Sequence, residues 1–473
     1  MKLPRLLISA AHKSSGKTTL TIGLARAFAR RGLRVQTFKK GPDYIDPMWL
    51  ARASGRACIN LDPHLMHDGE IAAALPRHAG DADLALVEGN KGLYDGLALD
   101  GSNSNAALAH RLDLPVVLVL DARGMTRGIA PLVLGYQAFD RGLAIGGVIL
   151  NQLGGSRHEA KLRAVIEHYT DVSVLGALPH DERLAMTERH LGLLTVAEAG
   201  DADARIDAMA SAVAAQVDLD RVLALAATAP PWPLVALPQE PAPASAAARL
   251  RIGIARDAAF GFYYPDDLAA LEAAGAALVP IDMLHDTRLP ALEGLFIGGG
   301  FPETAMAALE ANAALRAELR RAIEAGLPTY AECGGLMFLA RSIRWGDRVA
   351  QMVGAIPGDA VMHPRPMGRG YVQVEETAAF PWPTLDGAPA AGSLRQGHEF
   401  HHSSLEALDP GVSFAYRMRR GHGIDGRNDG LTLHRLLASY THLRATGGNA
   451  WPQRFMAYVR AARQQAAQRA QAA

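Results

Sequence analysis

The chain has 473 residues, which is too long for one ordinary hydrophobic core, so we expect two or three domains. Its 48 Lys and Arg residues balance 48 Asp and Glu residues, so no net charge recruits nucleic acid, and no apolar run approaches the length that spans a membrane. The two cysteines, Cys58 and Cys333, lie far apart in the sequence, which argues against a disulfide framework and favours a reduced, cytoplasmic setting.

The first predicted element is a strand over residues 6–11 that leads into a phosphate-binding loop and then a helical pattern. A strand, a tight loop and a helix in this order surround an anion with backbone N–H groups. Lys17 would reach the outer phosphates of ATP, and the Thr18 hydroxyl would ligate Mg²⁺, although Ala11 stands where the usual motif has glycine. The residues predicted to bind ATP in this loop are Ser15, Gly16, Lys17, Thr18 and Thr19.

Apolar runs recur over residues 6–11, 35–38, 84–87, 116–120 and 147–150, with helical patterns between several of them. This alternation predicts a parallel sheet with helices on both faces. In such sheets ligands bind beyond the carboxyl ends of the strands. The polar residues that follow each run are therefore the candidate site residues.

Carboxylates follow the second and third runs. Asp43 and Asp46 lie in a loop with two lysines and two prolines, which is either a solvated turn or a contact to Mg²⁺ or substrate. Glu88 ends the third run opposite the phosphate loop, where an NTPase holds its metal, so Glu88 is a candidate Mg²⁺ ligand. Asp95 would orient a substrate or the metal, or it would cap a turn.

Two further polar positions follow the strands. Residues 101–105 either cap a helix that begins near Ala106 or present hydroxyls and amides, Ser102 among them, to a ligand. Asn151 directly follows the fifth run, from which its amide could read an adenine edge.

A change of composition marks a domain boundary. Residues 226–247 are rich in proline and alanine and predict an extended linker, and a new strand pattern starts at residues 250–255. The predicted parts are a phosphate-binding domain over residues 1–200, a helical segment and linker over 201–248, a second domain over 249–460 and a C-terminal tail over 461–473.

Cys333 lies in the second half on a predicted strand-to-helix turn that is similar to a nucleophile elbow. A thiol there is exposed near a helix N-terminus, and neighbouring N–H groups can receive an oxyanion. The triple glycine over residues 298–300 could complete that oxyanion hole. A thiol nucleophile also needs a base. The candidate bases are His398, His401, His402, His434 and His442, and the spacing of the first three is not typical of a metal site.

Together these motifs resemble the cobyrinic acid a,c-diamide synthases over nearly the whole chain. The resemblance implies an α/β fold, with a P-loop parallel-sheet ATPase domain similar to dethiobiotin synthetase followed by a class I glutamine amidotransferase-like α/β domain. The matching segments are residues 15–18, 40–46, 88–89 with 92–96, 189–193, 257 with 259–260, 263–264, 298–303, 331–336, 397–401, and 438–440 with 442.

The family's site residues carry over at the matching positions. Cys333 would attack glutamine, and His442 would activate the thiol. Arg444 stands where class I amidotransferases usually have a glutamate, which leaves open what orients His442. Taken with the positions described above, the predicted oxyanion hole is Gly299, Gly300 and Gly334, and the predicted metal ligands are Thr18, Asp43 and Glu88. The predicted substrate-binding residues are Asp43, Tyr44, Asp46, Asp95 and Ser102, and Asn151 is predicted to join the nucleotide site.

The resemblance implies an ATP- and glutamine-dependent amidation. ATP with Mg²⁺ would convert a carboxylate of a tetrapyrrole into an acyl phosphate, and ammonia released from L-glutamine would attack it. The expected substrate is cobyrinic or hydrogenobyrinic acid, amidated on its a and c side chains in cobalamin biosynthesis. We expect these small molecules as partners, no nucleic acid and no membrane, and a protein that could form a homodimer.

Two alternatives stay open. Residues 90–91 and 100–105 depart from the family's pattern where the tetrapyrrole is expected, so the same chemistry on sirohaem or another modified tetrapyrrole competes. An ATP-switch protein that uses a degenerate amidotransferase domain for binding is a different class, but such ATPases carry lysine where this chain has His12.

Overall fold

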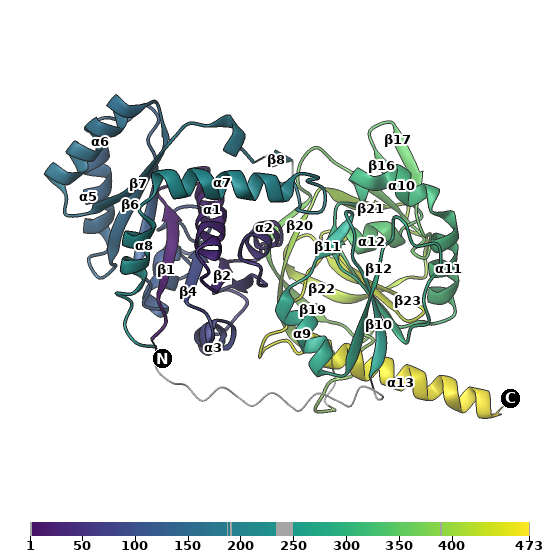
Figure 1. Ribbon diagram of the computed structural model, residues 1–473. Helices are drawn as coiled ribbons and strands as arrows, with labels where there is room; N and C mark the ends of the chain where they lie inside the picture. The colour runs from purple at the N-terminus through teal and green to yellow at the C-terminus, as the bar shows by residue number, and fades with distance from the viewer. Residues whose placement is uncertain (1, 187, 190–191, 233–248, 388–389, 473) are drawn as a thin grey trace. The chain divides into compact units, whose positions relative to one another are not determined.

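The computed structural model describes residues 2–186, 188–189, 192–232, 249–387 and 390–472. The chain divides into two compact units, Met1–Pro238 and Gln239–Ala473, each with its own core (Figure 1). The part of the predicted linker beyond Trp232, and His190 and Leu191 of a predicted motif, lie outside the described residues. None of the described helices is both long and apolar enough to cross a membrane.

The first unit contains a seven-stranded sheet in which all paired strands are parallel. The five apolar runs form β1, β2, β4, β5 and β6, as predicted, and β3 and β7 add a strand at each edge in the order β3-β2-β4-β1-β5-β6-β7. The strands are β1 (Arg5–Ala10), β2 (Val35–Lys40), β3 (Ile59–Leu61), β4 (Leu84–Glu88), β5 (Val116–Asp121), β6 (Ile145–Leu153) and β7 (Ser173–Pro179), and a separate antiparallel pair joins β8 (Glu188–Arg189) to β9 (Gly192–Leu193).

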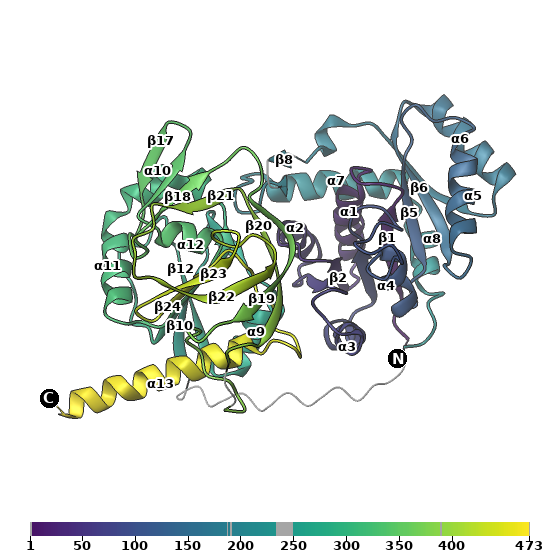
Figure 2. The ribbon, with the colours of Figure 1, turned by 180° about the vertical axis from the view of Figure 1, so that it is seen from behind.

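Helices cover both faces of this sheet (Figure 2). Alternate strand residues, Leu7 and Leu118 among them, share one buried apolar cluster with side chains of α3 to α6. The strand residues between them face the other way, where α1, α7 and α8 contact the sheet. The helices are α1 (Lys17–Arg30), α2 (Ile45–Ser54), α3 (Asp68–Ala79), α4 (Asn105–Arg111), α5 (Ile129–Phe139), α6 (Ser156–Tyr169), α7 (Ala202–Gln216), α8 (Leu219–Ala226) and the 3₁₀ turn η1 (Glu182–Leu184).

The helical segment after residue 200 packs on the first unit. A Cβ atom placed on Gly23 of α1 would lie 2.6 Å from Val213 Cγ2 of α7, so this close approach of the two helices requires glycine. Arg26 also donates to Asp207 across the same contact (2.9 Å). These contacts hold α1, the helix that begins at the phosphate loop, against α7.

The second unit contains a nine-stranded sheet in the order β12-β10-β13-β15-β24-β23-β22-β19-β20. The strands from β12 to β24 are parallel and the remaining ones antiparallel. Its strands are β10 (Leu250–Ala255), β12 (Ala276–Ile281), β13 (Gly294–Ile297), β15 (Thr329–Glu332), β19 (Gly368–Glu376), β20 (Leu394–His401), β22 (Ser413–Arg420), β23 (Asn428–Leu433) and β24 (Leu436–Ser439).

Smaller sheets and helices complete this unit. The parallel strands β13, β15 and β24 end beside one another, which is where a strand-to-helix turn can present a side chain. The other elements are β11 (Phe260–Phe262) paired with β14 (Gly299–Gly300), the sheet of β16 (Ser342–Trp345), β17 (Arg348–Gln351), β18 (Asp359–Met362) and β21 (Ser403–Glu406), and the helices α9 (Pro265–Ala273), η3 (Pro302–Ala305), α10 (Met306–Ala311), α11 (Ala313–Glu324), α12 (Gly334–Leu339) and α13 (Trp451–Ala472).

Candidate functional sites

The phosphate loop lies between β1 and α1, as predicted. Gly16 has a φ of 89°, in the left-handed region that favours glycine. A Cβ atom on Gly16 would lie 2.1 Å from Asn151 Nδ2, and that amide donates to the Ser15 carbonyl (2.9 Å). The side-chain amide of Asn151 therefore holds the backbone of the phosphate loop in place. The position of Asn151 after a strand did not reveal this contact. Thr19 lies half-buried in the first turn of α1.

Two buried lysines lie at this site, Lys17 at the start of α1 and Lys39 near the end of β2. Burial lowers the pKa of Lys17, and the nearby charge of Lys39 lowers it further. Burial also lowers the pKa of Lys39, but the charges of Asp46 and Glu88 outweigh that effect and raise it well above its ordinary value. Two lysines held together beside a helix N-terminus form an environment that favours a polyanion such as a nucleotide phosphate chain.

Thr18, Asp46 and Glu88 lie together at the start of α1. Thr18 Oγ1 donates to Glu88 Oε1 (2.7 Å) and to Asp46 Oδ2 (3.2 Å). Lys39 Nζ donates to the same two carboxylate atoms, at 2.5 Å to Asp46 and 3.0 Å to Glu88. Burial raises the pKa of Glu88 although Lys39 opposes that rise. Lys39 was not among the predicted site residues, because a lysine at the end of a strand has no spacing signal of its own.

No three His, Cys, Asp or Glu side chains among the described residues are arranged to hold a metal ion, but the oxygen atoms of this group are of the kind that Mg²⁺ binds. Glu88 is fully buried, and within the described ranges its Oε2 atom has no hydrogen-bond partner. A hydroxyl and two carboxylates are hard oxygen donors, which Mg²⁺ prefers together with phosphate oxygens. The predicted ligand Asp43 lies next to this group, with its Oδ2 atom 3.8 Å from Lys39 Nζ and its Oδ1 atom accepting from the N–H groups of Ile45 and Asp46. Tyr44 is half-buried just before α2.

The loop after β4 brings Asp95 near the phosphate loop. Asp95 Oδ2 accepts from the Gly92 N–H (2.8 Å), and its charge acts on Lys17. Asn105, which the sequence did not single out, is fully buried and ties this loop down by donating to the carbonyls of Asn90 and Gly92 at 2.7 and 2.8 Å.

Ser102 lies on the exposed part of the same loop. Its N–H donates to Asp100 Oδ1 (3.0 Å). The neighbouring Ser104 accepts from the Ala107 N–H (3.0 Å) and caps α4, so the predicted capping of this helix by the segment 101–105 is confirmed. Two apolar side chains, Leu97 and Leu99, are 51% and 107% exposed in this loop.

In the second unit, Cys333 occupies a strained turn between β15 and α12. Its φ of 47° and ψ of −100° are rare for a residue with a side chain, and such strain costs about 1–3 kcal/mol. The Cys333 N–H donates to the Ser439 carbonyl (2.7 Å), which ties the turn to β24. This geometry matches the predicted elbow, with the thiol at the helix N-terminus, but Cys333 is buried (8% exposed) and not exposed as the sequence predicted.

His442 is the candidate base that contacts Cys333. Burial lowers the pKa of His442, but hydrogen bonds to the Cys333 thiol and the Glu332 carboxylate, and their charges, raise it to about 10. The raised pKa favours a protonated imidazole beside the thiol, an arrangement typical of cysteine nucleophiles. His398 stacks on His442 (centroids 4.9 Å apart), and burial lowers its pKa well below the ordinary value, so His398 stays neutral.

The other histidines have different surroundings. His401 stacks on Tyr440 at 3.8 Å, and its Nδ1 atom lies 2.7 Å from the Ser403 carbonyl. His434 lies in the turn between β23 and β24, and His402 Nδ1 lies 3.2 Å from the His363 carbonyl. Of the five candidate histidines, His442 is the one that the structure brings to the thiol. Its position late in the sequence could not distinguish it from the other four.

The glycines predicted to form the oxyanion hole adjoin the thiol. A Cβ atom on Gly334 would lie 2.9 Å from the backbone N of Gly300, and one on Gly299 would lie 2.7 Å from His442 Cε1. On Gly300 itself it would lie 1.9 Å from the Ala259 carbonyl oxygen. The backbone of β14 therefore reaches both the elbow and the base, and side chains at these three positions would prevent this.

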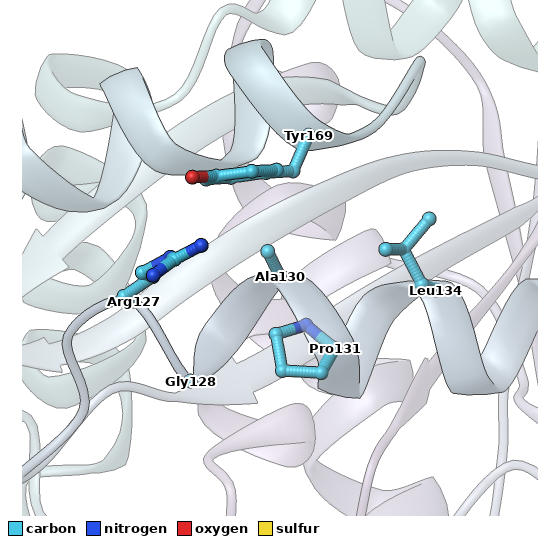
Figure 3. A pocket seen from close by; sticks show the side chains of 6 residues that line it. All are labelled: Arg127, Gly128, Ala130, Pro131, Leu134 and Tyr169. Atoms are coloured by element: carbon cyan, nitrogen blue, oxygen red, sulfur yellow. The ribbon is translucent and has the colours of Figure 1, made fainter.

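A cavity of about 350 Å³ lies between α5 and α6 of the first unit (Figure 3). Arg127 lies under the ring of Tyr169, 5.1 Å from its centroid. The lining residues are Arg127, Gly128, Ala130, Pro131, Leu134 and Tyr169, and none of them is a predicted site residue.

Comparison with known proteins agrees with this two-part arrangement. A family model described as "CobQ/CobB/MinD/ParA nucleotide binding domain" matches residues 7–193, and one described as "CobB/CobQ-like glutamine amidotransferase domain" matches residues 251–450. Among curated proteins, the cobyrinate a,c-diamide synthase of Magnetococcus marinus is 44% identical over 95% of this chain and 96% of its own length. Proteins of the same name from Methanosarcina acetivorans and Listeria monocytogenes are 40% and 38% identical, each over 93% of this chain and over 92% and 96% of their own lengths.

Proposed function

Because the chain belongs to the cobyrinate a,c-diamide synthase family, we propose that it amidates the a- and c-side-chain carboxylates of cobyrinic or hydrogenobyrinic acid with ATP and glutamine, in cobalamin biosynthesis. The observation that supports this proposal best is the pairing of Cys333, on its strained turn, with His442, which bonds the adjacent Glu332 (3.1 Å), in a chain that also carries a phosphate loop with Lys17 and Thr18. A protein that used its second unit for binding alone would not need that pair.

The first unit would activate the carboxylate. Lys17 and the N–H groups of the phosphate loop would hold the β- and γ-phosphates of ATP. Thr18, Asp46 and Glu88, with Asp43 beside them, would hold Mg²⁺, which neutralises charge as the phosphoryl group is transferred. The substrate carboxylate would attack the γ-phosphorus, so that ADP leaves and an acyl phosphate forms. Asp95, Tyr44 and Ser102 would contact the substrate.

The second unit would release ammonia. The Cys333 sulfur would attack the amide carbon of glutamine, and N–H groups of Gly300 and Gly334, with Gly299 beside them, would stabilise the oxyanion. His442 would give its proton to the leaving nitrogen, so that ammonia departs and a thioester remains. Water would then hydrolyse the thioester to glutamate. Ammonia would attack the acyl phosphate, form the amide and release inorganic phosphate.

A second candidate substrate is sirohaem. The loop that carries the exposed Leu97 and Leu99 also contains residues 90–91 and 100–105, where the sequence departs from corrinoid-amidating proteins. The apolar side chains suit a macrocycle face of either kind.

The substrate can be identified by mass spectrometry. The purified protein would be incubated with ATP, Mg²⁺ and glutamine and with cobyrinic acid, hydrogenobyrinic acid or sirohaem in turn. We expect two exchanges of hydroxyl for amino on cobyrinic or hydrogenobyrinic acid. Amidation of sirohaem alone would contradict the proposed substrate and favour the second candidate.

We also propose a homodimer in the cytoplasm. Both cysteines are free thiols, as a reducing compartment requires, and apolar side chains that a second copy would cover are exposed on α5 and α6. These side chains are Leu134, Phe139 and Tyr169, which are 43%, 77% and 42% exposed. Light scattering of the purified protein should give twice the chain mass, and a monomer at every concentration would contradict the dimer.

A further inference from the structure

We infer that Glu332, the residue immediately before the nucleophile, orients His442 and replaces the glutamate that usually follows the histidine in class I amidotransferases. This inference rests on the glutamine chemistry proposed above. It assigns Glu332 as a positioning residue that acts through His442 and makes no contact with glutamine itself.

The two oxygen atoms of Glu332 have separate partners. Oε2 accepts from His442 Nδ1 (3.1 Å), and both side chains are almost completely buried. Oε1 accepts from the Tyr330 hydroxyl (2.5 Å) and from the Leu443 N–H (3.0 Å). A carboxylate with three donors around it cannot rotate freely, so it fixes the plane of the imidazole. With Nδ1 bound to Glu332, the other ring nitrogen is the one that serves Cys333.

Tyr330 is itself held firmly. Its ring stacks on Phe296 with centroids 5.2 Å apart and planes at 11°, and it packs against Trp451 of α13. Burial, together with the nearby charge of Glu332, raises the pKa of Tyr330 well above its ordinary value, so its hydroxyl stays protonated and can donate. The aromatic core of the unit therefore holds the Tyr330 hydroxyl in position to bond the Glu332 carboxylate.

The position that usually supplies the glutamate serves another contact. Arg444 Nη2 donates to Asp266 Oδ2 (3.2 Å), and its guanidinium lies 4.8 Å over the ring of Tyr264. His398 stacks on His442 but is neutral, so it cannot supply the negative charge that stabilises an imidazolium. Glu332 is the carboxylate in hydrogen-bonding contact with His442 among the described contacts.

The test compares Glu332→Gln with Tyr330→Phe. Glu332→Gln keeps the shape but removes the charge, and we expect glutamine-dependent kcat to fall roughly 100- to 10,000-fold, as when the carboxylate of a catalytic triad is neutralised. The KM for glutamine should change little, since Glu332 does not touch substrate, and amidation with added ammonium should be kept. Tyr330→Phe removes one donor from the carboxylate and should lower the same kcat by a smaller factor, about two- to tenfold.

A buried carboxylate elsewhere in the unit provides the control. Glu376 is as buried as Glu332 and pairs with Arg454 and Arg395, so Glu376→Gln disturbs the fold without touching His442. Because none of the described contacts joins Glu376 to His442, Glu376→Gln should keep a glutamine-dependent kcat much closer to that of the wild type than Glu332→Gln does. The inference is wrong if Glu332→Gln keeps the wild-type glutamine-dependent kcat, or if Glu376→Gln lowers that kcat by as large a factor.

Two further results separate a failure of the role of Glu332 from a failure of the proposed function. If Glu332→Gln does not fold, Tyr330→Phe decides, because an unchanged glutamine-dependent kcat in that variant would overturn the inference. If the wild-type protein releases no glutamate from glutamine, the proposed function fails. If wild-type glutamate release is normal and both variants match it, only the role of Glu332 fails.

Discussion

Replacing Cys333 with serine is expected to lower glutamine-dependent amidation by at least about a thousandfold while sparing amidation with added ammonium. The hydroxyl of serine is a much weaker nucleophile than the sulfur beside the His442 imidazolium. The acyl phosphate would form in the first unit, and external ammonia would reach it without the thiol. Initial rates with glutamine and with ammonium chloride, on the same tetrapyrrole and with ATP, measure the two activities separately.

The second cysteine supplies a matched control. Cys58 is buried in the first unit, and burial raises its pKa far above the range in which thiols react. Cys58→Ala should therefore leave both activities close to those of the wild type. Loss of the ammonium-dependent rate in Cys333→Ser, with the protein still folded, would contradict separate sites for nitrogen release and carboxylate activation.

Replacing Lys17 with alanine is expected to lower amidation by about a thousandfold or more with either nitrogen source. Lys17 lies buried beside Lys39 in the phosphate loop, where its charge would stabilise the phosphoryl group during transfer. Both nitrogen sources need the acyl phosphate, so neither can bypass this loss. ADP release and product mass with ammonium chloride as donor measure the effect without the glutamine site.

The control for Lys17 is another lysine of the same unit. Lys161 is exposed on α6, so Lys161→Ala should amidate at the wild-type rate. A Lys17→Ala protein that still amidates with ammonium would remove the assignment of the phosphate loop to ATP. Loss of activity in both lysine variants would indicate damage to the fold instead.

Local patterns in the sequence predicted the framework of each site. The phosphate loop and the elbow at Cys333 depend on neighbouring residues, so their geometry follows from short motifs. Long apolar runs predicted β1, β2, β4, β5 and β6 because strands buried on both faces are apolar throughout. The edge strands β3 and β7 were not predicted, since Ile59–Leu61 is short and Ser173–Pro179 begins with serine and contains glycine.

Contacts between distant residues could not be predicted in this way. Glu332 is adjacent to the nucleophile, but its partner His442 lies 110 positions away, and only the pairing of β15 with β24 brings them together. Asn105 and Lys39 act through similar long-range contacts. Asn151 followed a strand as predicted, yet its amide donates to the Ser15 carbonyl, a contact that depends on the packing of β6 against the loop.

The central proposal is that one chain activates a carboxylate with ATP and attacks it with nitrogen taken from glutamine. A double isotope experiment tests it most directly, with ¹⁸O in the substrate carboxylates and ¹⁵N in the glutamine amide. We predict that one ¹⁸O atom appears in inorganic phosphate, and one ¹⁵N atom in the product, for each amide formed. Product that forms without ¹⁸O in the phosphate, or without ¹⁵N when glutamine is the donor, would contradict this chemistry.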